Sequence, residues 1–237
     1  MPGTMKAITK ILTVILLSGF STGLSAQTTV SQDIYIVKGA ESRRAISTVS
    51  GDISIGSVAN IKSNISTVSG DIEIGAKAKV EQVATVSGDI SVGKGARTHS
   101  LETVSGDIHL YSRSDVLGSI ETVSGDLICD TGCDIRKGLI TVSGDIELDD
   151  TRLRGNLKTV SGDISLFNGA VIDGDIIISR KRNFMSGTMG KLEVIIDMNS
   201  IVKGNIRVEE SETNVMVYLT NGGQVKGEII NAEVRKK

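Results

Sequence analysis

Thr48-Val49-Ser50-Gly51-Asp52-Ile53 is the stretch that decides the fold, because the chain carries it seven times. The copies begin at Thr48, Thr67, Thr85, Thr103, Thr122, Thr141 and Thr159, and Leu127 replaces the Ile of the fifth copy. Successive copies start 18 or 19 residues apart. Self-similarity at a fixed period is typical of repeat architectures, in which neighbouring units bury a shared core. The sequence therefore predicts a solenoid.

Further columns of mostly apolar residues keep the same period and alternate with polar residues. This alternation is the signature of a strand with one buried face. The columns are Ile46, Ile65, Val83, Leu101, Ile120, Leu139 and Leu157; Ile55, Ile74, Val92, Leu110, Cys129, Leu148 and Leu166; and Ile61, Val80, Thr98, Val116, Ile135, Leu153 and Ile172. We also assign the Val of each repeat to the core, which would turn its Thr and Ser outward.

Three short strands, separated by corners rich in Gly and Asp, fit one period. We predict an all-β, single-domain, three-sided parallel β-helix of about ten coils over residues 27–237, with a loop insertion at 179–191. The general preference of parallel crossovers favours right-handed winding. An 18-residue period also suits a left-handed hexapeptide helix.

Residues 1–26 have the pattern of a secretory signal peptide. Lys6 and Lys10 precede the apolar run at 11–17, and Leu24-Ser25-Ala26 forms a cleavage pattern between Ala26 and Gln27. The apolar run is shorter than the roughly 20 residues that span a bilayer. We therefore expect export to the periplasm or cell surface, with no transmembrane segment in the mature chain.

Charge and composition argue against several classes of function. The chain has 26 basic and 28 acidic residues, whereas nucleic-acid binding needs a concentrated positive surface. Between Asp33 and Asp163 the Lys and Arg residues lie outside the repeated hexapeptides and share their side with Glu81 and Glu121. This predicts a mixed-charge face. We expect no nucleic acid, nucleotide or cofactor as a partner.

The Asp of each repeat predicts a ladder of stacked carboxylates. Carboxylates about 5 Å apart repel by about 1 kcal/mol even in bulk water, so something must offset the repulsion. Backbone N–H groups at the corner are one candidate. Bridging Ca²⁺ is the other, although Ca²⁺ prefers six to eight oxygen ligands. The candidate metal ladder is Asp52, Asp71, Asp89, Asp107, Asp126, Asp145 and Asp163, with Asp33 preceding it.

If the Thr and Ser of the repeats face outward, they form a flat hydroxyl surface. Such a surface resembles the Thr arrays of ice-binding solenoids, but outward Thr is also simply a good strand residue. The candidate binding face is Thr48, Ser50, Thr67, Ser69, Thr85, Ser87, Thr103, Ser105, Thr122, Ser124, Thr141, Ser143, Thr159 and Ser161.

The remaining reactive residues give little support for catalysis. The repeated Ser lacks a nucleophile-elbow context, and His99 and His109 stand alone, with His109 expected to be solvated. Cys129 and Cys133 both fall on inward columns across one corner. In an exported protein they could form a disulfide, or they could be two small buried thiols. We expect no enzyme.

With this register, the chain resembles two groups of bacterial β-solenoids. The Ser-Gly-Asp-Ile repeats behind a signal peptide resemble adhesin-type solenoids of the cell envelope. The coils around Leu153, Ile172, Val202 and Val225 resemble bactofilins, which form polymers without nucleotide. The resemblance implies a non-enzymatic structural solenoid of the envelope that self-associates. The alternative is a surface adhesin or a binding module for a glycan, ice or Ca²⁺.

Overall fold

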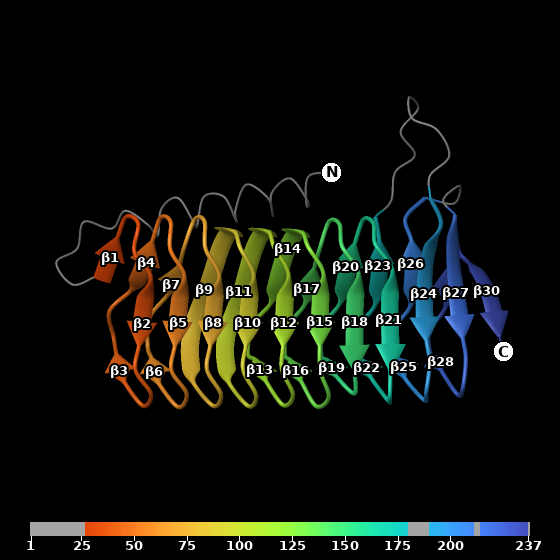
Figure 1. The fold of residues 1–237 in the computed structure, drawn as a ribbon. Coiled ribbons are helices and arrows are strands. Elements are labelled where there is room, and N and C mark those ends of the chain that lie inside the picture. Colours follow the sequence, from red (N-terminus) through yellow and green to blue (C-terminus); the bar gives the residue numbers. More distant parts are fainter. Residues whose placement is uncertain (1–26, 180–189, 211–213, 237) are drawn as a thin grey trace, which may run out of the picture.

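A computed structural model describes residues 27–179, 190–210 and 214–236 of the chain. These residues form parallel strands stacked coil upon coil, and no helix occurs among them (Figure 1). The signal-peptide prediction for 1–26 and most of the predicted insertion at 179–191 fall outside the described ranges. Across the insertion, the pairing of Ile164 with Val194 joins strands 30 residues apart instead of 18 or 19.

Each coil has three sides, which we number in chain order. Side 1 is an 11-stranded parallel sheet, and sides 2 and 3 together form a 19-stranded sheet. Side 1 comprises β2 (Ile34–Ile36), β5 (Ile53–Ile55), β8 (Ile72–Ile74), β10 (Ile90–Val92), β12 (Ile108–Leu110), β15 (Leu127–Cys129), β18 (Ile146–Asp149), β21 (Ile164–Phe167), β24 (Leu192–Ile196), β27 (Val215–Leu219) and β30 (Glu233–Lys236).

Sides 2 and 3 have shorter strands, which merge in two coils. Side 2 comprises β3 (Glu41–Ser42), β6 (Asn60–Ile61), β13 (Asp115–Val116), β16 (Asp134–Ile135), β19 (Arg152–Leu153), β22 (Val171–Ile172), β25 (Ile201–Val202) and β28 (Gln224–Val225). Side 3 comprises β1 (Gln27–Thr29), β4 (Ile46–Thr48), β7 (Ile65–Ser66), β14 (Ile120–Ser124), β17 (Leu139–Ile140), β20 (Leu157–Thr159), β23 (Ile176–Ile178), β26 (Ile206–Val208) and β29 (Ile229–Ile230). The continuous strands β9 (Lys79–Ser87) and β11 (Arg97–Ser105) run through both sides.

The winding is right-handed. In Figure 1 the strands of side 1 run downward at the front while the coils advance from left to right. Successive coils pair in register, as Ile53 with Ile72 and Ile55 with Ile74. The predicted three-sided parallel β-helix of about ten coils is thereby confirmed.

The predicted apolar columns line the core, and none of the buried side chains in the described part of the chain is aromatic. Ile53, Ile61 and Ile65 represent the three sides of one coil, and each is at most 1% exposed. Such residues suit a thin interior, because β-branched side chains pack well on a pleated surface. Stacking each coil on the next therefore buries an aliphatic core along the whole solenoid.

The orientation predicted for the repeated Thr and Val is wrong. All seven Thr residues of the repeats are buried, at 0–4% exposure, whereas Val49 and Val68 are 41% and 40% exposed. Strand alternation is the reason: the aliphatic residue two positions before each Thr faces inward, so Thr faces inward and the following Val outward. The hydrophobicity of Val had suggested the opposite phase.

The corner between sides 1 and 2 imposes a left-handed backbone conformation on every coil. Glycine supplies it in some coils, as at Gly39, where φ is +71°. Elsewhere Val58, Lys77 and Arg113 adopt it, at φ values of +57°, +59° and +62°. This conformation is costly for residues with a Cβ, and most of all for β-branched ones.

Candidate functional site

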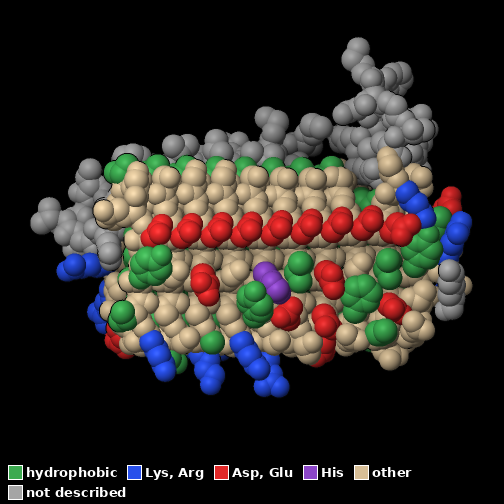
Figure 2. Space-filling model, in the orientation of Figure 1, with side chains coloured by type: hydrophobic (Ala, Val, Ile, Leu, Met, Phe, Trp, Pro, Cys, Tyr) green, Lys and Arg blue, Asp and Glu red, His purple; other side chains and the backbone are tan. Residues whose placement is uncertain are grey.

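The Asp ladder is held by backbone hydrogen bonds between coils. The backbone N–H of each Asp donates to Oδ1 of the Asp one coil earlier, with N···O distances of 2.7–3.0 Å from Asp33 to Asp163. The Glu193 N–H continues the ladder by donating to Asp163 Oδ1 at 2.8 Å. Figure 2 shows the resulting row of acidic side chains along the solenoid. The backbone account of the ladder is thus observed directly.

The Gly before each Asp permits this close stacking. A Cβ placed on Gly106 would lie 2.0 Å from the carbonyl oxygen of Gly88, and Gly88 has the same relation to Gly70. Real Cβ atoms do not approach backbone so closely, and here the neighbour is a rigid carbonyl. The repeated Gly is therefore required by contact between coils.

A second ladder, which was not predicted from the sequence, runs along the corner between sides 2 and 3. The Asp175 N–H donates to Asn156 Oδ1, the Asn205 N–H to Asp175 Oδ1, and the Glu228 N–H to Asn205 Oδ1, all at 2.8–2.9 Å. The recurring Gly-Asn or Gly-Asp after Leu153, Ile172 and Val202 was the available signal. Because Asn accepts this bond as Asp does, the ladder needs an oxygen rather than a charge.

The inward Thr hydroxyls lie along the inner corner of side 3. Thr67 Oγ1 donates to the Gly51 carbonyl and Thr85 Oγ1 to the Gly70 carbonyl, both at 3.3 Å. In contrast, the hydroxyls of Thr103 and Thr122 have no hydrogen-bond partner. The predicted hydroxyl face thus keeps only its Ser residues, which are exposed except for the half-buried Ser161. Val residues take the outward positions that had been predicted for Thr.

Charged residues on side 2 pair between coils. Arg152 makes a bidentate contact with Asp173, with Nη2 2.8 Å and Nε 3.0 Å from Oδ2, and Lys203 Nζ lies 2.8 Å from Asp173 Oδ1. Burial favours a higher pKa for Asp173, but the hydrogen bonds from Lys203 and Arg152 outweigh it and lower the pKa below its ordinary value. Arg97 pairs with Asp115 in the same way at 2.8 Å. The mixed-charge face is therefore a network of ion pairs across coils.

Cys129 and Cys133 are free, buried thiols and form no disulfide in this structure. Burial raises the pKa of Cys129 well above its ordinary value and that of Cys133 to about 11. Cys133 Sγ lies 3.5 Å from the Tyr111 carbonyl oxygen. Thiols in this state are poor nucleophiles and poor metal ligands at neutral pH.

His109 lies on an outward position, as predicted, and 32% of its side chain is exposed, but it also has partners that the sequence did not indicate. Its Nε2 lies 3.0 Å from Asp130 Oδ1, and its ring stacks on Tyr111 with centroids 4.0 Å apart. His99, on the other side of the coil, is exposed. Within 27–179, 190–210 and 214–236, no three His, Cys, Asp or Glu side chains are grouped to hold a metal ion. No described helix is long and apolar enough to cross a membrane.

Both ends of the described solenoid leave strand edges unpaired. At the N-terminal end β1, β2 and β3 each pair only with the next coil, through β4, β5 and β6. At the C-terminal end β28, β29 and β30 pair only with β25, β26 and β27. Unpaired edges of this kind are templates for adding further strands.

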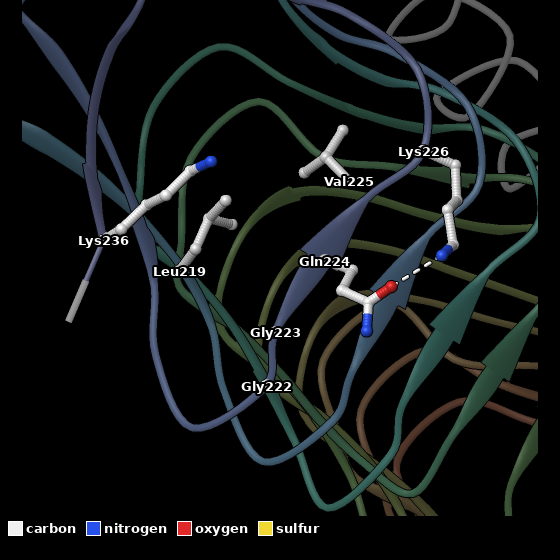
Figure 3. Close-up of a pocket in the computed structure, with 7 residues that line it drawn as sticks. All are labelled: Leu219, Gly222, Gly223, Gln224, Val225, Lys226 and Lys236. Carbon is white, nitrogen blue, oxygen red and sulfur yellow. Dashed lines mark hydrogen bonds between the residues drawn. The ribbon is translucent and has the colours of Figure 1, made fainter.

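The C-terminal end is also hollow. An open depression of about 330 Å³ lies over β28 and is lined by Leu219, Gly223, Gln224, Val225 and Lys236, among others (Figure 3). Leu219 and Val225 belong to the partly buried rim of the aliphatic core. This end of the core is therefore incompletely covered by the described chain.

Comparison with known protein families supports the architecture. The family model described as Toastrack DUF4097 matches residues 16–137 and 82–191, together well over half of the chain. No curated protein and no solved structure matches the chain. The family description names no activity, ligand or partner. The stacked parallel coils and the extent of the match lead to one conclusion: this chain belongs to the Toastrack DUF4097 family.

Proposed function

We propose that this protein is an exported, non-enzymatic structural solenoid of the bacterial cell envelope that self-associates through its ends. The observation that carries the proposal is the pair of ends of the described solenoid, where six strands have no described neighbour on one edge and the core is partly exposed. Stable monomeric solenoids usually cover such ends. The signal-peptide pattern of residues 1–26 supports export.

Sedimentation and negative-stain microscopy of the exported protein test self-association. Filaments or concentration-dependent oligomers support the proposal, and a strict monomer at high concentration refutes it. Val234→Lys places a charge on the last strand, where Val234 is 42% exposed, and should abolish assembly. Ile128→Lys is the matched control, because Ile128 is 38% exposed but lies on β15 in the middle of the solenoid. Mass spectrometry of the exported chain tests processing, with Gln27 expected as the first residue.

A surface binding module is the second candidate function. The outward Val column, with Ser and Asp beside it, forms a long regular face that repeats once per coil. Such a face suits an extended polymeric ligand such as an envelope glycan. Pull-down with purified envelope glycans tests this function. Ice binding is no longer supported by a Thr array, because the Thr side chains are buried.

A further inference from the structure

The two ends of the spiral start and stop on different sides. The described chain begins with β1 on side 3 and finishes with β30 on side 1. Because the chain rises by one strand spacing per turn, the three end strands lie at different heights. The end surface therefore has a step between its lowest strand and its highest strand. At the N-terminal end the step falls between sides 2 and 3. At the C-terminal end it falls between sides 1 and 2.

This offset decides how a second copy fits head to tail. If the neighbour keeps the same rotational setting, its β1 stacks on β29 and its β2 on β30, but its β3 lies two strand spacings, roughly 9–10 Å, above β28. One strand is then missing from side 2, above the hollow lined by Val225 and Lys236. If the neighbour is turned by one side, about a third of a turn, β1 stacks on β28, β2 on β29 and β3 on β30. The spiral then continues without a gap.

The cross-section permits this turn. Inward residues recur about every six residues around a coil, as at Ile53, Ala59 and Ile65, so the three sides have similar lengths. In the turned setting the inward Ile34 of one copy stacks on the inward Ile229 of the other. This apolar column therefore continues across the junction.

Charge favours the same setting. The turned neighbour places Glu41 beside Arg235, both on outward positions, and Ser42 beside Lys236, whose position in its strand faces the core. Without the turn, Lys236 would stack against Ile36 and Arg235 against Tyr35. A pair of opposite charges on stacked strands is favourable, whereas stacking a lysine against an isoleucine on an inward column is costly.

We infer that the protein assembles head to tail with a second copy of itself, each copy turned by one side of the solenoid relative to the last. The inference rests on the proposed self-association and adds its polarity and rotation. It identifies the open edges of β28, β29 and β30 as the surface that receives β1, β2 and β3.

Disulfide trapping in the assembled protein tests the arrangement. Tyr35→Cys with Ile230→Cys joins positions that stack only in the turned setting. Tyr35→Cys with Arg235→Cys is the matched pair for the unturned setting. Stacked parallel positions lie within the 4.4–6.8 Å between Cα atoms that a disulfide needs, while positions on different sides do not. Tyr35→Cys alone forms a disulfide-linked dimer only if the N-terminal ends of two copies meet. The unaltered chain, whose thiols are buried, measures the background of nonspecific disulfide formation.

We expect a ladder of covalent multimers for Tyr35→Cys with Ile230→Cys, and monomer from the other variants on a non-reducing gel. Multimers from the Arg235→Cys pair would overturn the rotation, and dimers from Tyr35→Cys alone would overturn the polarity. In either case self-association would stand. If the variants and the unaltered chain all sediment as monomers, the proposed function itself fails.

Discussion

Replacing Thr98 by Val is expected to stabilise the protein. Thr98 is fully buried on an aliphatic column, and its hydroxyl has no hydrogen-bond partner. Its stacked neighbours are Val80 and Val116. An unpaired buried hydroxyl costs about 1–3 kcal/mol, and Val keeps the shape of the side chain. We therefore expect the free energy of unfolding to rise by about 1–2 kcal/mol.

Thr85→Val is the matched control, because Thr85 is equally buried but donates to the Gly70 carbonyl at 3.3 Å. Loss of that bond offsets the gain from the added methyl group, so this variant should be neutral or destabilised by up to about 1 kcal/mol. Urea denaturation followed by circular dichroism measures both variants against the unaltered chain. The midpoint should rise for Thr98→Val at an unchanged slope. Equal destabilisation of the two variants would refute the reasoning.

Three further predictions concern the ladders and the ion pairs. Asp107→Asn should be neutral or slightly stabilising at low salt, because the amide oxygen still accepts the Asp126 N–H while the repulsion between neighbouring carboxylates falls. Asp107→Ala loses that acceptor and should destabilise the protein by about 1 kcal/mol. Equal denaturation midpoints for the two variants would contradict this account of the ladder. Gly106→Ala should prevent native stacking, because its Cβ would meet a backbone carbonyl. Gly39→Ala should cost only about 1–2 kcal/mol, because its Cβ meets nothing and only the positive φ is strained. Thermal melts should show a much larger loss of melting temperature for Gly106→Ala than for Gly39→Ala. The pKa of Asp173 is lowered in the folded chain, so its stabilisation is complete above the unfolded pKa of about 3.9 and is lost as the pH falls below it. The fall in melting temperature between pH 5 and pH 3 should therefore be smaller for Asp173→Asn than for the unaltered chain. An equal fall in the two proteins would show that Asp173 does not contribute to the acid sensitivity.

Much of the fold was predictable because the repeat fixes the register. The period alone predicts that Ile53 stacks on Ile72 and Asp52 on Asp71, as the structure has them. The choice of backbone N–H groups as partners of the carboxylates followed from ordinary turn chemistry. Stacking in register leaves little freedom in the core.

The features that were not predicted depend on strand phase, which sets which side chains face inward, or on the backbone geometry of the corners. The phase through Thr48 and Val49 depends on where the corner begins, and hydrophobicity alone misassigned it. The left-handed corner conformation is held by Val58 without the glycine that would have signalled it. His109 contacts Asp130 of the next coil and Tyr111 of its own coil, and both contacts depend on side-chain rotamers at the surface. No period in the sequence encodes those contacts.

The Asp ladder also makes the repeats interchangeable. Each bond joins a repeat to an identical position in the next repeat, so it depends on no residue outside the motif. Removing or duplicating one whole period would rejoin the ladder to an equivalent partner. The length of the molecule can therefore change during evolution in steps of about 4.8 Å without redesign of either end. The number of repeats encoded in the gene therefore sets the length of the solenoid.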